Sequence, residues 1–236
     1  MSPARPWDDP RVASGFRAQL ARREERFGAG EAHLGWKVGF GSPESLARLE
    51  LGGPLVGFLT REALVEAGGS VSVSGWAKPV AEPEIAVYLD RDLPGGRGRE
   101  AAREAIGALG PALELADVTF PPDDVERILA ENIYARVVAL GAFNAAGAGG
   151  GVHGLRPRLL VDGREAAAAD DPQALTGELV TVVSQVADLL DAFGLVLAAG
   201  DVVIAGSVVP PLDVRAGGRL RFELGVLGDL ELEVVP

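Results

Sequence analysis

From Val71 to its end, the chain is a succession of short apolar runs separated by glycine and proline. The sequence holds 32 glycines and 16 prolines, and both residue types interrupt regular helices and strands. Short runs of branched residues between such breaks are typical of strands. Three of these runs lie beyond residue 200, which disfavours a regular alternation of strand and helix. We therefore expect an α+β fold built on a mixed, rolled sheet.

Helices and strands are predicted along the whole chain from periodicity and from end signals. A first helix follows the capping residues Asp8 and Asp9, begins near Pro10 and ends at Gly28. The other predicted helices cover residues 42–49, 99–109, 121–129 and 171–194. Strands are predicted at 35–40, 84–89, 112–118, 136–143, 157–161, 202–204, 219–224 and 230–235. We expect one domain over residues 1–236, with an N-terminal helical arm over about residues 1–60.

Composition removes several classes of function. The chain has no cysteine and only two histidines, His33 and His153, which excludes thiolate chemistry and disfavours multi-histidine metal sites. A net charge of -12 repels phosphate backbones, so nucleic-acid binding is not expected. No stretch reaches the roughly 18 apolar residues of a membrane span, and residues 1–9 lack a signal peptide's apolar segment. We expect a soluble cytoplasmic protein in which carboxylates hold any metal, favouring Mg²⁺ or Mn²⁺.

Three glutamates lie in apolar, strand-like segments, where burying an unpaired carboxylate would cost folding free energy. Glu82 and Glu84 are two residues apart, so they would share one face of a strand, opposite Ile85 and its apolar successors. Taken by itself, this pair could lie on a solvent-exposed edge strand, because Pro83 cannot donate a backbone hydrogen bond to a neighbouring strand. Glu114, however, interrupts a second apolar run. If the two strands are neighbours, the three carboxylates converge on a site that Mg²⁺ would neutralise and leave open to a 2-oxo acid.

Five motifs resemble those of the fumarylacetoacetate hydrolase superfamily, in its branch of 2-keto-4-pentenoate hydratases and 4-oxalocrotonate decarboxylases. In chain order they are Gly35-Trp36-Lys37-Val38-Gly39, Glu82-Pro83-Glu84-Ile85-Ala86, Pro111-Ala112-Leu113-Glu114, Glu131-Asn132 and Gly200-Asp201-Val202-Val203-Ile204-Ala205-Gly206-Ser207. The resemblance extends over roughly residues 10–235. It implies that superfamily's mixed β-roll with flanking helices, and a metal held by Glu82, Glu84 and Glu114.

The resemblance also implies roles for residues around the metal. Lys37 would bind the substrate carboxylate or move protons, with a plain strand lysine as the alternative. Asn132 matches a pocket asparagine and is the second catalytic candidate, and Ser207 is the candidate for substrate binding. The substrate would be a 2-hydroxy-2,4-dienoate, which becomes its 2-oxo tautomer before a hydratase adds water at C4.

The sequence departs from the family pattern at several places. Where many relatives carry Gly-His-Pro, it reads Gly177-Glu178-Leu179, and apolar residues at 208–211 replace polar ones. We therefore hypothesise a substrate with an apolar tail. A vinylogous 2-oxo acid decarboxylase, an acylpyruvate-type C–C hydrolase and a non-catalytic subunit of a partner enzyme in the same pathway remain open. Both histidines are expected to be structural or exposed, and a homo-oligomer is expected because relatives associate.

Overall fold

A computed structural model describes residues 5–236, and residues 1–4 of the predicted N-terminal arm lie outside this part. The α-helices are α1 (Pro10–Gly28), α2 (Pro43–Leu49), α3 (Gly98–Ala105), α4 (Val125–Ala130) and α5 (Leu179–Ala192). The strands are β1 (His33–Gly39), β2 (Leu55–Thr60), β3 (Leu64–Val65), β4 (Ser70–Ser72), β5 (Pro79–Leu89), β6 (Ile106–Asp117), β7 (Ala135–Leu140), β8 (Arg158–Val161), β9 (Arg164–Ala168), β10 (Val202–Ser207), β11 (Leu212–Asp213), β12 (Arg219–Glu223) and β13 (Asp229–Val235). Across residues 5–236, no helix has the length and apolar character that crossing a membrane requires.

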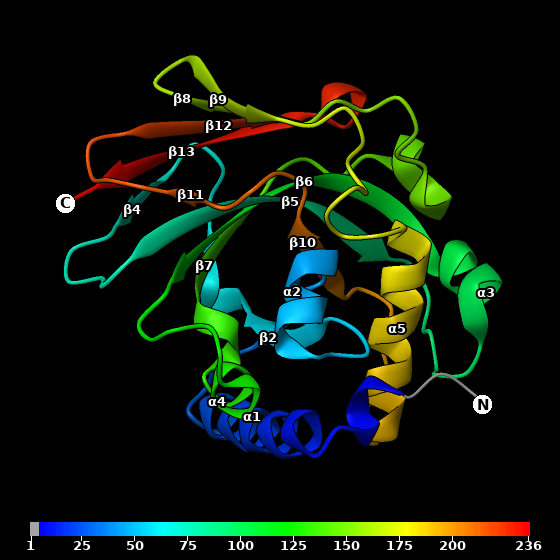
Figure 1. Ribbon diagram of the computed structural model, residues 1–236. Coiled ribbons are helices and arrows are strands. Elements are labelled where there is room, and N and C mark those ends of the chain that lie inside the picture. Colours follow the sequence, from blue (N-terminus) through cyan, green and yellow to red (C-terminus); the bar gives the residue numbers. More distant parts are fainter. Residues whose placement is uncertain (1–4) are drawn as a thin grey trace.

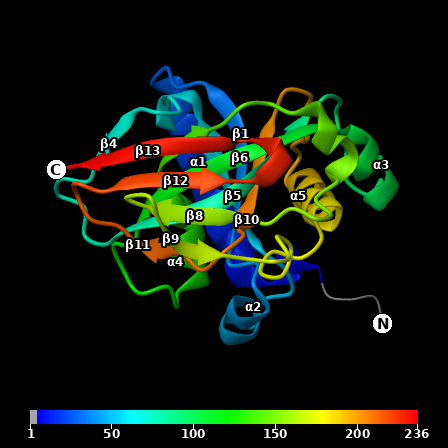
Figure 2. The same cartoon turned by 90° about the horizontal axis from the view of Figure 1, so that it is seen from above.

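The strands form two sheets (Figures 1 and 2). The larger sheet has the order β2-β1-β10-β5-β6-β7-β3, with β11 beside β5. Its strand β1 is parallel to β10, whereas β5 is antiparallel to β10, β6 and β11. The smaller sheet, in the order β4-β13-β12-β8-β9, packs over β6 and β7. The predicted α+β fold with a mixed, rolled sheet is confirmed.

The middle of β5 has two different faces, because successive side chains of a strand point in opposite directions. Ile85 and Val87 lie in the main hydrophobic core, which also holds the inner side chains of the smaller sheet. Ala86 belongs to a second, smaller apolar cluster on the other side of the larger sheet. Glu82 and Glu84 share the face of Ala86, as the two-residue period predicts. The larger sheet thus carries its carboxylates on the side that faces away from the main core.

The predicted helix over residues 99–109 is wrong beyond residue 105. Ile106 and Leu109 instead begin β6 and pair with Leu89 and Val87 of β5. Pairing with a long neighbouring strand outweighs the helical periodicity of this short segment. Gly107 marks the change, since a Cβ atom at this position would lie 2.8 Å from the Cβ atom of Asp90.

The predicted helix over residues 171–194 begins eight residues later than expected, at Leu179. Gly177 has a φ of +81°, a left-handed conformation that interrupts a regular helix. Asp171 caps a local turn instead, where its Oδ1 accepts the N–H of Gln173 at 2.9 Å. The Oε1 of Gln173 then accepts the N–H of Leu179 at 2.9 Å, so a side chain satisfies the first turn of α5.

Candidate active site

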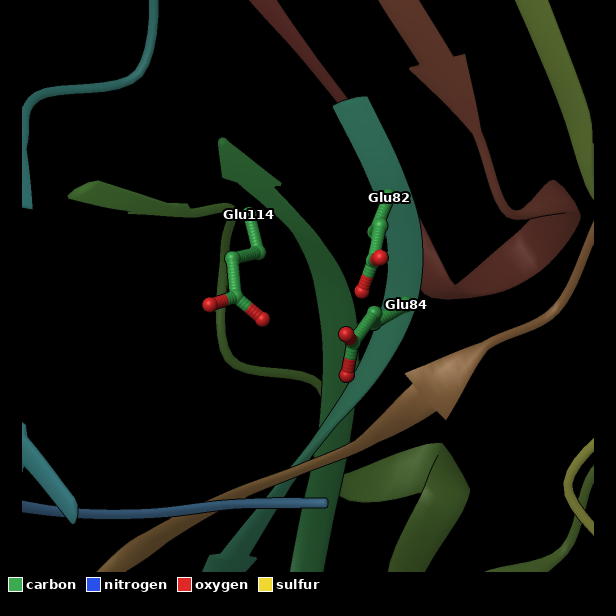
Figure 3. A group of neighbouring side chains, drawn as sticks. All are labelled: Glu82, Glu84 and Glu114. Carbon is green, nitrogen blue, oxygen red and sulfur yellow. The ribbon is translucent and has the colours of Figure 1, made fainter. Parts of the chain in front are cut away.

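Strands β5 and β6 bring the three predicted metal ligands together (Figure 3). Glu82 lies directly opposite Glu114 in the antiparallel register, and Glu84 follows on the same face of β5. One carboxylate oxygen of each residue lies within 4.8 Å of the others. The two acidic strands are therefore neighbours, which is the condition that the sequence-based hypothesis required.

Two oxygen atoms of this cluster are buried without a hydrogen-bond partner, Oε1 of Glu84 and Oε2 of Glu114. Glu84 and Glu114 are only 0% and 1% exposed, whereas Glu82 reaches a cavity. The other oxygen of Glu84, Oε2, accepts the backbone N–H of Gly206 at 2.7 Å. Leaving a buried polar atom unpaired is strongly unfavourable. The donor set therefore fits a hard divalent cation, which prefers oxygen ligands.

Two of the three carboxylates have raised pKa values, because burial and mutual repulsion disfavour their charged forms. Burial, with repulsion from Glu114, raises the pKa of Glu82 from its ordinary value of 4.5 to about 7. Burial and then the charges of Glu114 and Glu82 raise the pKa of Glu84 well above its ordinary value. Carboxylates this close cannot all ionise without compensation. A bound cation would supply it.

Lys37, on β1, is 1% exposed and lies beside the carboxylates. Its Nζ donates to the carboxylate of Glu114 and, at 3.0 Å, to the backbone carbonyl of Ile133. Burial by itself would lower the pKa of Lys37, but the neighbouring carboxylates, Glu114 first, outweigh it and the pKa is raised. Gly57 faces this lysine on β2, where a Cβ atom would lie 2.8 Å from the Cγ of Lys37. Glycine here leaves room for the lysine chain.

Asn132, Ile133 and Tyr134 form a left-handed turn, with φ values of 55°, 52° and 59°. Three such residues in a row without glycine store backbone strain, so the surroundings must hold them. Asn132 does this with Phe58 of β2: its Oδ1 accepts the N–H and its Nδ2 donates to the carbonyl, both at 2.9 Å. The turn directs the carbonyl of Ile133 at Lys37. Both polar ends of the Asn132 side chain are thus engaged by β2.

A cavity of about 490 Å³ leads from Glu82 and Lys37 to the surface. Ser207 also lines it, and its Oγ donates to the carbonyl of Val209 at 2.6 Å. Thr176, next to the segment that replaces Gly-His-Pro, lines the same cavity. The structure therefore brings Lys37, Ser207 and the metal-ligand candidates to one place, whereas Asn132 is buried and does not line the cavity.

Neither histidine lines this cavity. The Nε2 of His33 lies 3.0 Å from the Oδ1 of Asp201, and its ring packs edge-on against Trp36. His153 is exposed. These positions agree with the structural and surface roles expected for the two residues.

Sequence patterns miss the backbone groups of the site, namely the N–H of Gly206 and the carbonyl of Ile133. Backbone groups are present in every residue, so their use leaves no pattern of residue types. One available signal is Gly206 itself, whose φ of +95° lies in a region that favours glycine.

Sequence comparisons link the chain to enzymes of known activity. The profile of the fumarylacetoacetate (FAA) hydrolase C-terminal family matches residues 36–235. A 4-oxalocrotonate decarboxylase of Pseudomonas sp. is 29% identical over 220 residues, which cover 91% of this chain and 82% of that protein. A 2-hydroxyhexa-2,4-dienoate hydratase of Comamonas testosteroni is 27% identical over 227 residues, covering 94% of this chain and 86% of the hydratase.

Solved structures share the fold. The 4-oxalocrotonate decarboxylase of Pseudomonas putida G7, complexed with magnesium and adipate, matches with a TM-score of 0.88 at 22% identity, covering 95% of this chain and 86% of that one. The fumarylpyruvate hydrolase of Pseudomonas aeruginosa, in complex with Mn²⁺ and pyruvate, matches with a TM-score of 0.69 at 18% identity. The match covers 86% of this chain and 90% of the hydrolase. The mixed β-roll that the sequence motifs imply is confirmed by these structures.

Proposed function

Because this chain belongs to the fumarylacetoacetate hydrolase family, we propose that it is a divalent-metal-dependent lyase that adds water to a 2-hydroxy-2,4-dienoate in its 2-oxo form. Its named relatives are hydratases and a decarboxylase, so the chain is an enzyme of this group. One observation carries the proposal. Three carboxylates converge beside Lys37 at the inner end of a cavity, and two of their buried oxygens lack a partner.

In this proposal, Glu82, Glu84 and Glu114 hold Mg²⁺ or Mn²⁺. Structures with the same fold are complexed with magnesium, calcium or manganese, which supports a divalent ion. Three carboxylates leave about three positions of an octahedral shell for water and substrate oxygens. When bound, the ion supplies Lewis-acid stabilisation of the charge that develops on the oxygen of a 2-oxo acid. The N–H of Gly206 fixes the orientation of Glu84 for this task.

The other predicted site residues take different roles. Lys37 Nζ keeps its proton beside the carboxylates, so it can donate a hydrogen bond to the substrate carboxylate or deliver a proton. Asn132 positions Lys37 through the left-handed turn and does not contact the substrate. Ser207 lines the cavity and, with its proton committed to Val209, can accept a hydrogen bond from a substrate hydroxyl.

The variant Glu84→Gln tests the metal site. We expect the affinity for Mg²⁺ to fall by more than about tenfold in calorimetric titration, because a neutral amide oxygen replaces a charged ligand. Turnover of the dienoate should fall in parallel. The matched control is Glu100→Gln on α3, whose side chain is 87% exposed, and it should leave both unchanged. Unchanged Mg²⁺ binding and turnover in Glu84→Gln would refute the assignment.

Two parallel measurements separate the candidate reactions. Loss of the dienoate without release of CO₂ is the result we expect from a hydratase. Release of CO₂ from a vinylogous 2-oxo acid, without hydration, would instead establish the decarboxylase that the similarity to 4-oxalocrotonate decarboxylase also supports. A C–C hydrolase needs a base that activates water. Neither histidine lines the cavity, so neither is placed to serve as that base. Metal binding without turnover of any of these substrates would point to the non-catalytic subunit.

A further inference from the structure

Lys37 is a cation built into the carboxylate cluster. Its Nζ donates to the carboxylate of Glu114 and, at 3.0 Å, to the carbonyl of Ile133, and its side chain is 1% exposed. Gly57 packs against the same side chain, where a Cβ atom would lie 2.8 Å from Cγ and 3.2 Å from Cδ of Lys37. Two hydrogen bonds and this close packing hold the ammonium group in place. Its positive charge is therefore a fixed part of the cluster.

The charge of Lys37 acts on all three carboxylates. Burial and then repulsion between the carboxylates raise the pKa of Glu82 and of Glu84, and the charge of Lys37 opposes both rises. Burial by itself would lower the pKa of Lys37, but the three carboxylates together outweigh it. Charges that lie close together with little water between them interact strongly. Lys37 and the three glutamates thus act as one electrostatic unit, which we call the charge group.

Two arginines near the charge group are paired with acids of their own. A small cavity of about 10 Å³ reaches Glu114, and Arg26 and Arg136 line it. Arg26 lies 2.6 Å from the carboxylate of Glu31, and Arg136 lies 3.3 Å from that of Asp117. Each arginine is therefore compensated outside the charge group.

The mouth of the main cavity carries charges of both signs. Lys78 lies 3.7 Å from the carboxylate of Asp213, with side chains that are 59% and 74% exposed. Glu44 and Arg48 are exposed as well and lie four residues apart on one face of α2. Water and salt screen exposed charges. The charge at the inner end of the cavity is consequently set by the charge group.

Three ionised carboxylates and one ammonium group have a net charge of -2 (Figure 3 shows the carboxylates). A divalent ion makes this buried group neutral, whereas a trivalent ion would leave a positive charge without a partner, which is unfavourable. Without Lys37, the same carboxylates would match a trivalent ion instead.

We propose that Lys37 sets the valence selectivity of the metal site. By holding the net charge at -2, it favours divalent ions and discriminates against trivalent ions of the same size. A neutral loaded centre also does not repel the anionic 2-oxo acid, as a centre of three carboxylates and a divalent ion would. The inference rests on the proposed metal site and adds the residue that selects the ion.

The ratio of the affinities for Tb³⁺ and Ca²⁺ tests the inference without turnover. The two ions have similar radii and both take oxygen ligands, so their ratio reports the effect of charge. Both displace the same protons from the carboxylates, so the acidity of the cluster cancels. Calorimetric titration of the metal-free protein with each ion, in the absence of substrate, gives the ratio. Lys37→Met should raise it in favour of Tb³⁺ by at least about tenfold. The matched control is Lys78→Met, at the other lysine of the chain, and it should leave the ratio unchanged.

Replacing Glu114 extends the series of net charges. Glu114→Gln, with a net charge of -1, should lower the ratio by at least about tenfold. The double variant Lys37→Met/Glu114→Gln has the wild-type charge of -2 again, so its ratio should return to near the wild-type value. Because it removes both partners of the buried ion pair, it leaves neither charge unpaired. These two proteins test the inference even if Lys37→Met alone does not fold.

The outcomes separate this inference from the proposed function. Equal ratios in wild type and either single variant, or a ratio in the double variant far from that of wild type, would overturn the role of Lys37 and leave the metal site intact. If neither ion binds the wild-type protein, the proposed metal site is wrong, and the inference falls with it.

Discussion

Lys37 and Glu114 form an ion pair in which each side chain is only 1% exposed. Burying two charges is costly, and their attraction offsets this cost only when their remaining hydrogen-bonding positions are also satisfied. Lys37 has a second partner in the carbonyl of Ile133, but one oxygen of Glu114 has none. One hydrogen-bonding position of this buried ion pair is therefore unsatisfied, and a cation bound to the free oxygen of Glu114 would satisfy it.

The residues of the site differ in how far the sequence predicts them. Glu82 and Glu84 follow from the two-residue period of a strand, and Glu114 from its position in an apolar run. The role of Lys37 depends on the resemblance, because a single lysine in a strand carries no signal of its own. The contact between Asn132 and Phe58 was not predictable, since it depends on a turn and a strand 74 residues apart.

The raised pKa of Glu82 predicts how the stability of the metal-free protein depends on pH. Below about pH 4.5 the Glu82 carboxyl is protonated in both the folded and the unfolded chain, so it does not make the free energy of unfolding depend on pH. As the pH rises toward 7, the unfolded chain releases the proton first, so the free energy of unfolding decreases, by at most on the order of 3 kcal/mol for this group. Above pH 7 the decrease is complete. Mg²⁺ should restore the lost stability.

Denaturant unfolding of wild type and Glu82→Gln in EDTA, at several pH values, measures this effect. The variant removes the titrating group, so wild type should lose stability relative to it between pH 4.5 and pH 7. A difference that stays constant across this range would show that the carboxylate is not perturbed in the folded protein.

At the scale of elements, the parallel pair β1 and β10 places Lys37. Asp201, just before β10, accepts the indole N–H of Trp36 at 3.2 Å and the backbone N–H of Ala198 at 3.1 Å. Trp36 pairs with Val203 in the register between these strands. Because neighbouring residues of a strand point to opposite faces, fixing Trp36 in the main core directs Lys37 to the carboxylates. Two motifs that are far apart in the sequence thus act as one structural unit.

Two substitutions of Asn132 distinguish the backbone strain of the left-handed turn at residues 132–134 from the hydrogen bonds that hold this turn to Phe58. Asn132→Gly keeps the backbone conformation but loses both bonds to Phe58, which should lower the free energy of unfolding by about 1–3 kcal/mol. Asn132→Ala loses the same bonds and also requires alanine at a φ of 55°, which adds about 1 kcal/mol. Turnover should fall in both variants, because the turn is no longer tied to β2 and the carbonyl of Ile133 holds Lys37 less firmly.

Chemical denaturation and steady-state kinetics of the two variants provide the check. The Michaelis constant and the turnover number separate the roles, since a positioning residue acts mainly on the turnover number. Wild-type turnover in a folded Asn132→Gly protein would mean that the turn is only structural. Equal stability of the two variants would mean that the turn is not strained.

Elements whose ends depend on tertiary contacts are the ones that the sequence predicts least well. Residues 106–109 continue a helical pattern, yet they pair with β5. The start of α5 depends on Gly177 and on a side-chain bond from Gln173, neither of which changes the apolar period of the segment. Strand β2 escapes prediction as well, because its burial is continuous and gives no alternation.

At the scale of the whole molecule, the site depends on segments that only the rolled sheet brings together. Lys37 comes from β1, the carboxylates from β5 and β6, the turn from the chain before β7, and Gly206 from β10. Local patterns predict the class of fold, because strand-like runs beyond residue 200 disfavour a regular alternation of strand and helix. They do not predict the order of strands, in which the N-terminal β1 and β2 join β10 and β5.

The central claim is that Glu82, Glu84 and Glu114 together hold one divalent ion at the inner end of the cavity. A crystal structure with Mn²⁺ and oxalate, recorded with anomalous scattering at the manganese edge, tests it most directly. We expect a single strong anomalous peak between the three carboxylates, with oxalate completing the coordination on the side of the cavity. An ion bound elsewhere, or no peak at this position in crystals saturated with Mn²⁺, would contradict the claim.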